Sequence, residues 1–350
     1  TGCRSSAASD VYKRQVVEPT GNGIGSDGFA LVWDGEKLQG FNGSGRSPAG
    51  WTRDRFRHST TMPRYGWDAV TVPGAVDLWA TLSDTFGALP FDTLFEPAVR
   101  YARGGFPVSP ITALKWAEAE AIYGGMAAFA DTFLPGGRAP RPGEYFRCPA
   151  QAESLEAIAG TRGRALYEGE LARKTVACAQ ADGGAMTLED MAAHRTERVV
   201  PISWPYRAAT LHEIPPNGQG LAALVALGVL DRFDMPAFPP DSADSIHLQL
   251  EAMKIGFGVA HRMVADPSSM VHRLETVLDQ GFLNRQAGTI RMDGVSRPDL
   301  SFPVNQGTVY LTAADAGGMM VSMIQSNFTG FGSGVVIPGT GIHLQNRGMA

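Results

Sequence analysis

The sequence is poor in the residues that build metal and redox sites. Only three of its 350 residues are cysteines (Cys3, Cys148 and Cys178), and they form no CxxC pair. Its seven histidines are scattered, and no HExxH motif occurs. Such histidines are typical of a surface or a satisfied core, and nothing supports a zinc site or a redox motif. We therefore expect neither a metal nor a cofactor.

An excess of positive charge and long apolar runs are also missing. The net charge is -5 at pH 7, which argues against a nucleic-acid partner. The longest apolar run, Leu221 to Leu230, is too short to cross a bilayer. No GxSxG motif occurs, which disfavours a Ser-His-Asp hydrolase built on a nucleophile elbow. With 44% hydrophobic and 19% charged residues, the composition is that of an ordinary globular chain.

The start of the chain combines an unusual leader with a glycine-rich run. Thr1 to Gln15 has no apolar segment of the signal-peptide kind, and we predict that it is an appended leader or a translated sequencing artefact outside the fold. Gly23, Gly25 and Gly28 then form a GxGxxG pattern. A dinucleotide fingerprint needs a helix opening on the glycines, whereas Phe29 to Trp33 is predicted to be a strand. The pattern therefore does not indicate a cofactor site.

A β-hairpin followed by a glycine-rich loop is predicted near the end of the chain. Thr308 to Ala314 is rich in strand-forming residues, and Met319 to Ser326 has the character of a returning strand. Asp315 to Gly318 supplies the turn residues between them. The loop Gly330 to Gly334 has a backbone that a ligand could approach closely.

The middle of the chain alternates strands with apolar-periodic helices, which predicts layers of helices on sheets. A helix is predicted from Ala75 to Phe86, and a long one from Asp241 to Val264. On the long helix, Ile246, Leu250, Met253 and Phe257 recur at helical spacing and are predicted to face the core. Further predicted helices lie at 112–129, 151–159, 168–181 and 221–233.

The segment Gly307-Thr308-Val309-Tyr310-Leu311-Thr312, with Gly330-Phe331-Gly332-Ser333-Gly334 and Pro338-Gly339-Thr340-Gly341-Ile342 after it, resembles the γ-glutamyltransferase (glutathione hydrolase) family. The resemblance spans Val16 to Arg347. It implies an α+β fold, the four-layer αββα N-terminal-nucleophile hydrolase sandwich, truncated at its C-terminal end. It also implies that the precursor cuts its own chain between Gly307 and Thr308. Residues 16–307 would form the large subunit, residues 308–350 the start of the small subunit, and the two would remain together as a heterodimer.

A threonine at a new chain start suits this chemistry. A hydroxyl is a weak nucleophile that needs a base. The α-amine of an N-terminal threonine has a pKa of about 8, so a useful fraction is neutral at pH 7. In the family the threonine is the nucleophile, which points to Thr308 as both nucleophile and base.

Four further positions carry over from the resemblance. Ser326 falls where the family has a threonine that hydrogen-bonds the nucleophile. Arg46, two residues before Pro48 rather than four, is expected to grip a substrate carboxylate, since a guanidinium offers a fork of donors. Asn327 lies next to the position of a substrate-binding asparagine. Arg347 replaces a glutamine that helps to hold the glutamate moiety, which puts the standard glutathione substrate in question.

The resemblance implies a self-processing hydrolase or transferase that cleaves γ-glutamyl amides, such as glutathione, by way of a γ-glutamyl-enzyme. An acylase of another amide, with a cephalosporin-type or γ-linked peptide side chain, is the alternative on the same fold. A non-catalytic relative that is never processed is a third. The family's oxyanion-hole glycines lie far downstream, so we expect the 350-residue chain alone to be inactive. The sequence does not reveal the localisation.

Overall fold

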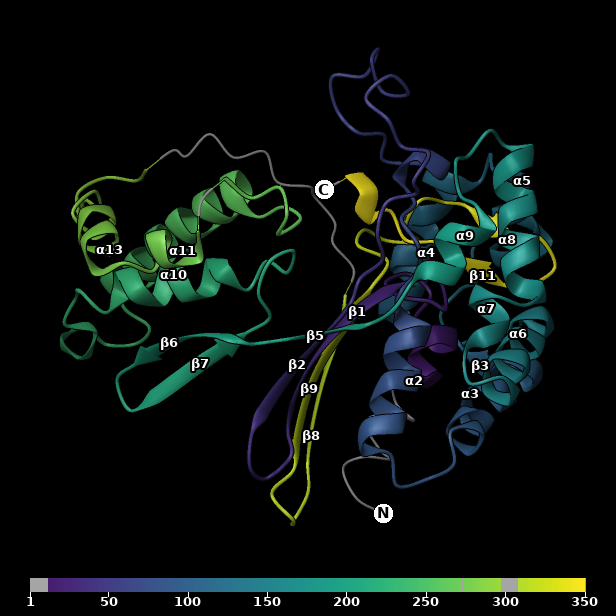
Figure 1. Ribbon diagram of the computed structural model, residues 1–350, viewed down its shortest axis with the longest axis horizontal. Coiled ribbons are helices and arrows are strands. Elements are labelled where there is room, and N and C mark those ends of the chain that lie inside the picture. The colour runs from purple at the N-terminus through teal and green to yellow at the C-terminus, as the bar shows by residue number, and fades with distance from the viewer. Residues whose placement is uncertain (1–11, 272, 297–307, 350) are drawn as a thin grey trace. The chain divides into compact units, whose positions relative to one another are not determined.

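The computed structural model describes residues 12–271, 273–296 and 308–349. The chain folds into two compact units, each with its own hydrophobic core (Figure 1). The described residues of the first unit lie within Thr1–Lys37, Phe41–Glu197 and Val304–Ala350. Those of the second lie within Leu38–Gly40 and Arg198–Pro303.

A sheet joins strands from opposite ends of the chain, as the purple and yellow ribbons of Figure 1 show. Its strands in spatial order are β5 (Glu197–Val199), β2 (Leu38–Gly43), β1 (Asp27–Trp33), β9 (Met320–Ser326) and β8 (Val309–Ala314). β9 runs antiparallel to both of its neighbours. The register places Asp27 opposite Ser326 and Val309 opposite Gln325. Residues about 300 positions apart in sequence are thus neighbours on adjacent strands.

The predicted hairpin is confirmed as β8 and β9. Its turn is fixed by Asp315, whose Oδ1 accepts hydrogen bonds from the backbone N–H groups of Gly317 (2.9 Å) and Met319 (3.2 Å). Gly318 has a φ of +86°, a conformation that favours glycine. The hairpin therefore forms from local turn chemistry and presents β9 to β1.

Helix α2 (Ala75–Phe86) has the predicted bounds and packs directly on the backbone of the sheet. A Cβ at Gly28 would lie 2.9 Å from Leu78 Cδ2, and one at Gly43 would lie 2.6 Å from Leu78 Cβ. Glycine at these two positions lets the helix approach the strands. Gly28 of the GxGxxG pattern thus serves packing, which agrees with the rejection of a dinucleotide site.

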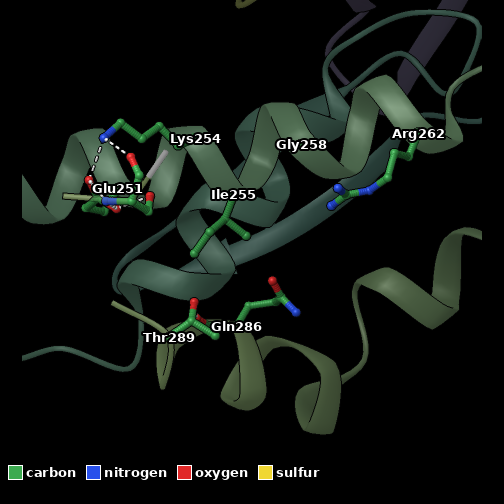
Figure 2. Close-up of a pocket in the computed structure, with 8 residues that line it drawn as sticks. Glu251, Lys254, Ile255, Gly258, Arg262, Gln286 and Thr289 are labelled. Atoms are coloured by element: carbon green, nitrogen blue, oxygen red, sulfur yellow. Dashed lines mark hydrogen bonds and ion pairs between the residues drawn. The ribbon is translucent and has the colours of Figure 1, made fainter. Parts of the chain in front are cut away.

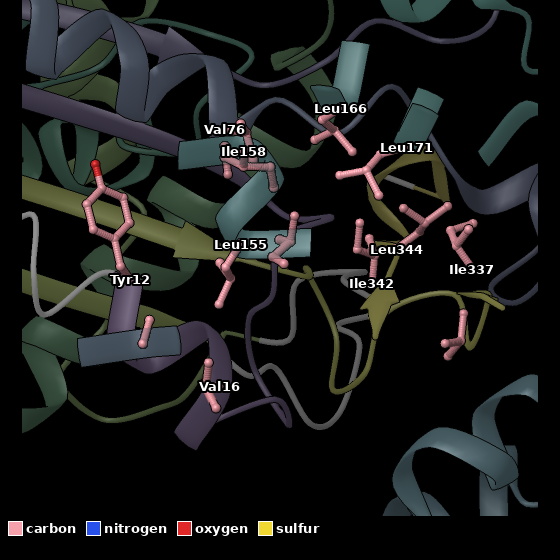
Figure 3. Packing of buried hydrophobic residues seen from close by; sticks show 14 of the residues in the cluster. Tyr12, Val16, Val76, Leu155, Ile158, Leu166, Leu171, Ile337, Ile342 and Leu344 are labelled. Carbon is pink, nitrogen blue, oxygen red and sulfur yellow. The ribbon is translucent and has the colours of Figure 1, made fainter. Parts of the chain in front are cut away.

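Further helices surround a core that reaches the glycine-rich end of the chain (Figure 3). They are α3 (Glu96–Gly104), α4 (Pro110–Tyr123), α5 (Ala127–Phe133), α6 (Pro149–Gly160), α7 (Arg164–Tyr167), α8 (Glu170–Ala181) and α9 (Leu188–Ala193). Leu155, Leu166 and Leu171, from α6, α7 and α8, share one cluster with Ile337 and Ile342 of the ribbon β10 (Val336–Ile337) and β11 (Ile342–His343). A second ribbon pairs β3 (Phe106–Pro107) with β4 (Tyr145–Phe146).

Phe331 anchors the glycine-rich loop. Its ring is fully buried, with centroids 5.0 Å from Phe129, 5.1 Å from Phe133 and 5.5 Å from Trp116. Edge and tilted aromatic contacts of this kind stabilise a core beyond the area that they bury. The loop that follows β9 is therefore tied to the helical layer.

The expectation that Thr1 to Gln15 lies outside the fold is wrong for residues 12–15. These residues begin a helical turn over 12–17. Tyr12 is 2% exposed, stacks on Phe95 with a centroid separation of 4.3 Å, and contacts Trp79 edge-on. Burial of the large Tyr12 ring against other aromatic rings stabilises this segment in the fold. Its partners Trp79 and Phe95 are distant in sequence, so the local sequence did not reveal the contact.

The second unit is built on helices α10 (Leu221–Leu230) and α11 (Ala243–Met263), with the β6–β7 ribbon beside α10. Its remaining elements are β6 (Ile202–Tyr206), β7 (Ala209–Glu213), α12 (Leu274–Val277) and α13 (Gln280–Ala287). Among the described residues, no helix combines the length and apolarity needed to cross a bilayer.

The predicted core face of α11 is wrong for Ile246 and Leu250, whereas Met253 packs against the core as predicted. Ile246 and Leu250 are 47% and 57% exposed, whereas Leu248 and Ala252 are fully buried. The close approach of α10 at Gly256 determines which face of α11 is buried, because a Cβ at Gly256 would lie 2.2 Å from a backbone carbonyl oxygen of α10. Apolar residues occur at helical spacing on two faces of α11, so periodicity alone could not choose between them.

Candidate active site

Thr308 lies directly before β8, and its hydroxyl meets the end of β9. Thr308 Oγ1 donates a hydrogen bond to Ser326 Oγ at 3.2 Å. Pairing of Val309 with Gln325 places Thr308 at the edge of the hairpin beside Ser326. Thr308 is exposed and Ser326 is buried. The structure thus brings together the two hydroxyls that the sequence singled out, and their catalytic roles remain predictions. Gly307, the other half of the expected cleavage site, lies outside the described residues.

Asn327 is held inside the protein, and its expected role in substrate binding stays a prediction. Its side chain is fully buried. Its Oδ1 accepts from Ser26 Oγ at 2.7 Å, and its Nδ2 donates to the Gly330 carbonyl at 3.1 Å and to His343 Nε2 at 3.0 Å. Because the amide already has these partners, Asn327 serves to join the start of β1 to the glycine-rich loop.

His343 is the core histidine of this network. Its ring is fully buried, and burial lowers its pKa to about 4, so it is neutral at pH 7. A Cβ at Gly23 would lie 2.4 Å from His343 Cε1, and one at Gly25 would lie 2.2 Å from the His343 carbonyl oxygen. The first two glycines of the GxGxxG pattern therefore make room for β11 rather than for a phosphate.

A buried carboxylate that sequence reasoning missed lies one strand away from Ser326. Asp27 has no exposed surface, and its Oδ1 accepts hydrogen bonds from the N–H groups of Gly74 (2.9 Å) and Gly45 (3.2 Å). Its Oδ2 accepts one from Arg347 Nε at 3.1 Å. A signal was present, because Asp27 is the single charged residue of the otherwise apolar strand DGFALVW.

Arg347 is held on three sides. Besides its bond to Asp27, its guanidinium carbon lies 5.2 Å from the ring centroid of Phe328 and 5.8 Å from that of Phe29. Cations are attracted to aromatic faces at such distances. Its backbone N–H also donates to the Gln345 side chain. The side chain keeps 22% of its surface exposed, so the cation is ordered and still reachable.

Arg46 lies on the loop next to this cluster but points elsewhere. Its Nη2 forms an ion pair with Glu197 at 2.8 Å, and its side chain is 79% exposed. The neighbouring Gly45 donates to Asp27, so the Arg46 backbone passes close to the buried carboxylate. Surface ion pairs contribute little to stability. Arg46 therefore lies near the site without being fixed in it, and its expected grip on a substrate stays a prediction.

Burial raises the pKa of Asp27 to about 6, although Arg347 and the two backbone N–H groups oppose the shift. An unfolded aspartate titrates near 3.9. Protonation therefore favours the folded state, and this contribution is fully present below about pH 4 and is lost as the pH rises through about 6. We expect the wild-type protein to gain stability relative to Asp27→Asn as the pH falls from 6 to 4.

Urea unfolding of both proteins at several pH values measures this difference. The comparison cancels the opposite titration of His343, which both proteins keep and whose lowered pKa removes stability as the pH falls toward 4. A stability difference that stays constant between pH 4 and pH 6 would contradict the assignment.

A pocket in the second unit lies between α11 and α13 (Figure 2). Its buried carboxylate, Glu251, is satisfied by Lys254 Nζ at 2.6 Å and by Ser296. Within the described residues, no group of three or more histidine, cysteine, aspartate or glutamate side chains could hold a metal ion. Glu251 is already paired with Lys254, which makes it a poor base for the Ser296 hydroxyl that donates to it. The hydroxyl pair of the first unit is therefore the better candidate for chemistry.

Comparison with known proteins identifies the family of the chain. A family model described as gamma-glutamyltranspeptidase matches residues 7–350. The chain belongs to the gamma-glutamyltranspeptidase family. Its model match begins at residue 7, so the predicted lack of any family likeness before Val16 is also too broad.

Relatives within the gamma-glutamyltranspeptidase family differ in what they act on. The glutathione hydrolase-like YwrD proenzyme of Bacillus subtilis is 37% identical over 95% of this chain and 64% of its own length. The oxamate amidohydrolase proenzyme of Klebsiella pneumoniae is 34% identical over 96% of this chain and 64% of its own length.

The solved cephalosporin acylase from Bacillus halodurans has a TM-score of 0.93 and 42% identity to this chain, covering 99% of this chain and 65% of that one. The predicted α+β, N-terminal-nucleophile hydrolase fold is thereby confirmed. The chain spans just under two thirds of the length of each of these three proteins.

Proposed function

We propose that this protein is a self-processing amidohydrolase or acyltransferase whose nucleophile is Thr308. The hydrogen bond between Thr308 Oγ1 and Ser326 Oγ, at the head of β8, is the observation that carries the proposal. A hydroxyl at this place becomes useful once the peptide bond ahead of it is cut, because the new α-amine supplies the base.

Two reactions would use the same hydroxyl. In the first, Thr308 Oγ1 attacks the carbonyl carbon of Gly307, the peptide C–N bond breaks, and the released amine takes the hydroxyl proton. Water then hydrolyses the ester, which leaves a carboxylate on Gly307 and a free amine on Thr308. In the second, the free amine takes the hydroxyl proton while Oγ1 attacks a substrate amide, and the proton passes to the leaving amine. Water or an acceptor amine removes the acyl group.

The two pieces of the cut chain would stay together as a heterodimer. Strand β9 pairs with β1 along the whole of β1, and β8 pairs with β9. A cut before Thr308 breaks none of these pairings. The described hydrogen bonds would therefore hold the catalytic segment in the sheet after processing.

A γ-glutamyl amide such as glutathione is the first candidate substrate, as the family suggests. An amide with another acyl group is the second, and two observations favour it. The amide of Asn327 is occupied inside the protein, and a cation, Arg347, stands where the family has a neutral glutamine. A site built in this way is better suited to a substrate anion than to the ammonium of a glutamyl group.

Processing and amide cleavage together test the proposal. This and the following experiments use the complete protein as its source produces it. We expect a denaturing gel to show two bands, and the N-terminal sequence of the smaller one to begin at Thr308. We also expect release of p-nitroaniline from γ-glutamyl or other acyl anilides. A single uncut chain without amidase activity would instead support the non-catalytic alternative.

Removing the partner hydroxyl tests how Thr308 is positioned. We expect Ser326→Ala to lower kcat about ten- to a hundredfold, the usual range for one lost hydrogen bond to a group that becomes charged. Ser326→Thr keeps the hydroxyl and should restore most of the rate. Steady-state kinetics with one anilide measure both. Equal rates for the alanine variant and the wild type would remove Ser326 from the site.

A further inference from the structure

The guanidinium of Arg347 has an unused edge. Its Nε is bonded to Asp27 Oδ2, and its faces lie against Phe29 and Phe328. Among the described residues, neither Nη nitrogen has a hydrogen-bond partner, although the side chain is only 22% exposed. Arginine carries its positive charge at all relevant pH values, and its two Nη groups match the two oxygens of a carboxylate.

This edge is held in a fixed orientation. Asp27 is completely buried and cannot move away, because its Oδ1 is also held by two backbone N–H groups. Phe328 adopts a φ of +76°, which is uncommon for a residue with a side chain. Strain of this kind persists where the surroundings enforce it, and here it accompanies the contact between the Phe328 ring and Arg347. A ligand would bind a side chain that is already ordered.

A short series of contacts links Arg347 to Thr308. Asp27, its anchor, is the cross-strand partner of Ser326, and Ser326 accepts the hydrogen bond of Thr308. Ser326 Oγ also accepts the N–H of Phe328 at 2.8 Å, so the ring on Arg347 and the hydroxyl pair belong to one local structure. An acyl chain with its carbonyl carbon at Thr308 would extend along these contacts toward Arg347.

We propose that the Nη edge of Arg347 binds a carboxylate on the acyl part of the substrate, so that the substrates are monoamides of short dicarboxylic acids that need no amino group. The inference rests on the proposed function for the position of the scissile amide. It assigns the carboxylate to Arg347 rather than to Arg46, whose side chain is exposed and paired with Glu197.

Three acyl anilides with the same leaving group test the substrate class in the complete protein. Glutaryl-p-nitroanilide carries the carboxylate, γ-glutamyl-p-nitroanilide adds an amino group, and butyryl-p-nitroanilide has neither. We expect the glutaryl compound to have at least the kcat/KM of the γ-glutamyl compound and to exceed the butyryl compound about ten- to a hundredfold, as for charged hydrogen bonds. Equal kcat/KM for glutaryl and butyryl, or a clear preference for γ-glutamyl over glutaryl, would overturn the proposal.

Variants separate the two arginines. Arg347→Gln should raise KM for the glutaryl compound about tenfold or more beyond any change that it causes with the butyryl compound, which has no carboxylate to lose. Arg347→Lys should recover part of the affinity, because it keeps the charge without the fork. Arg46→Gln is the matched control and should leave the glutaryl KM near that of the wild type. The reverse pattern would assign the carboxylate to Arg46.

Binding without turnover makes the inference independent of the reaction. Calorimetry should show that the wild type binds glutarate and not butyrate, and that Arg347→Gln loses glutarate binding. The binding comparison remains valid even if no anilide is cleaved. In that case the proposed function would fail, and the carboxylate site at Arg347 would not. Equal affinity of the wild type for glutarate and butyrate overturns the inference alone and needs no variant that might misfold.

Discussion

Thr308→Ala is expected to leave the protein as one uncut chain with no measurable amidase activity. The change removes the only hydroxyl that can attack the Gly307 carbonyl from the adjacent residue, so no new N-terminus forms. It also removes the attacking atom of the second reaction. Loss of a nucleophile of this kind lowers turnover by roughly a thousandfold or more. A denaturing gel and an anilide assay on the complete protein measure both effects.

Two controls show whether the effect is chemical. Thr308→Ser keeps a hydroxyl and should still be cut, though more slowly. Thr312 lies four residues after Thr308, at an exposed position of β8. The Thr312→Ala variant should be cut and active like the wild type. An intact Thr308→Ala chain with full turnover would refute the whole mechanism.

Asp27→Ala is expected to destabilise the first unit by about 3–5 kcal/mol, the usual effect of removing one partner of a buried ion pair. The variant leaves the N–H groups of Gly45 and Gly74 without their acceptor and leaves Arg347 without its anchor. Buried donors without partners add to the loss. Equilibrium unfolding in urea of the complete protein measures the change in unfolding free energy.

The exposed ion pair nearby supplies the matched control. Glu197→Ala also breaks an arginine–carboxylate ion pair, the one with Arg46, but both of its side chains are more than half exposed. Its effect should not exceed about 1 kcal/mol. Asp27→Asn, which keeps an acceptor oxygen, should fall between the two. Equal stability of Asp27→Ala and Glu197→Ala would show that the buried carboxylate has no structural role.

Local patterns in the sequence predicted the parts of this protein that local chemistry determines. The hairpin around Asp315 and helix α2 follow from turn residues and periodicity, whereas the pairing of Ser326 with Thr308 was implied by the resemblance to the family. Each depends on neighbours within about twenty residues, and the resemblance to the family supplied the meaning of Thr308.

The features that the sequence did not predict depend on distant partners. Asp27 and Arg347 are 320 positions apart, and the sequence around either residue does not indicate that the two form an ion pair. The amide of Asn327 is bonded to Ser26, which lies 301 positions away. On α11, two apolar faces competed, and only the approach of α10 at Gly256 decided which one is buried.

The pairing of β1 with β9 determines when a newly synthesised chain can cleave itself. Ribosomes would complete β1 nearly 300 residues before β9 exists, and joining such distant segments is a slow, late event in folding. The hydroxyl pair forms only when that joining is complete, so an immature chain could not cut itself. The fraction of cleaved molecules in a cell would then report the fraction that has folded correctly. A copy in which β1 and β9 have not yet paired would have no enzyme activity.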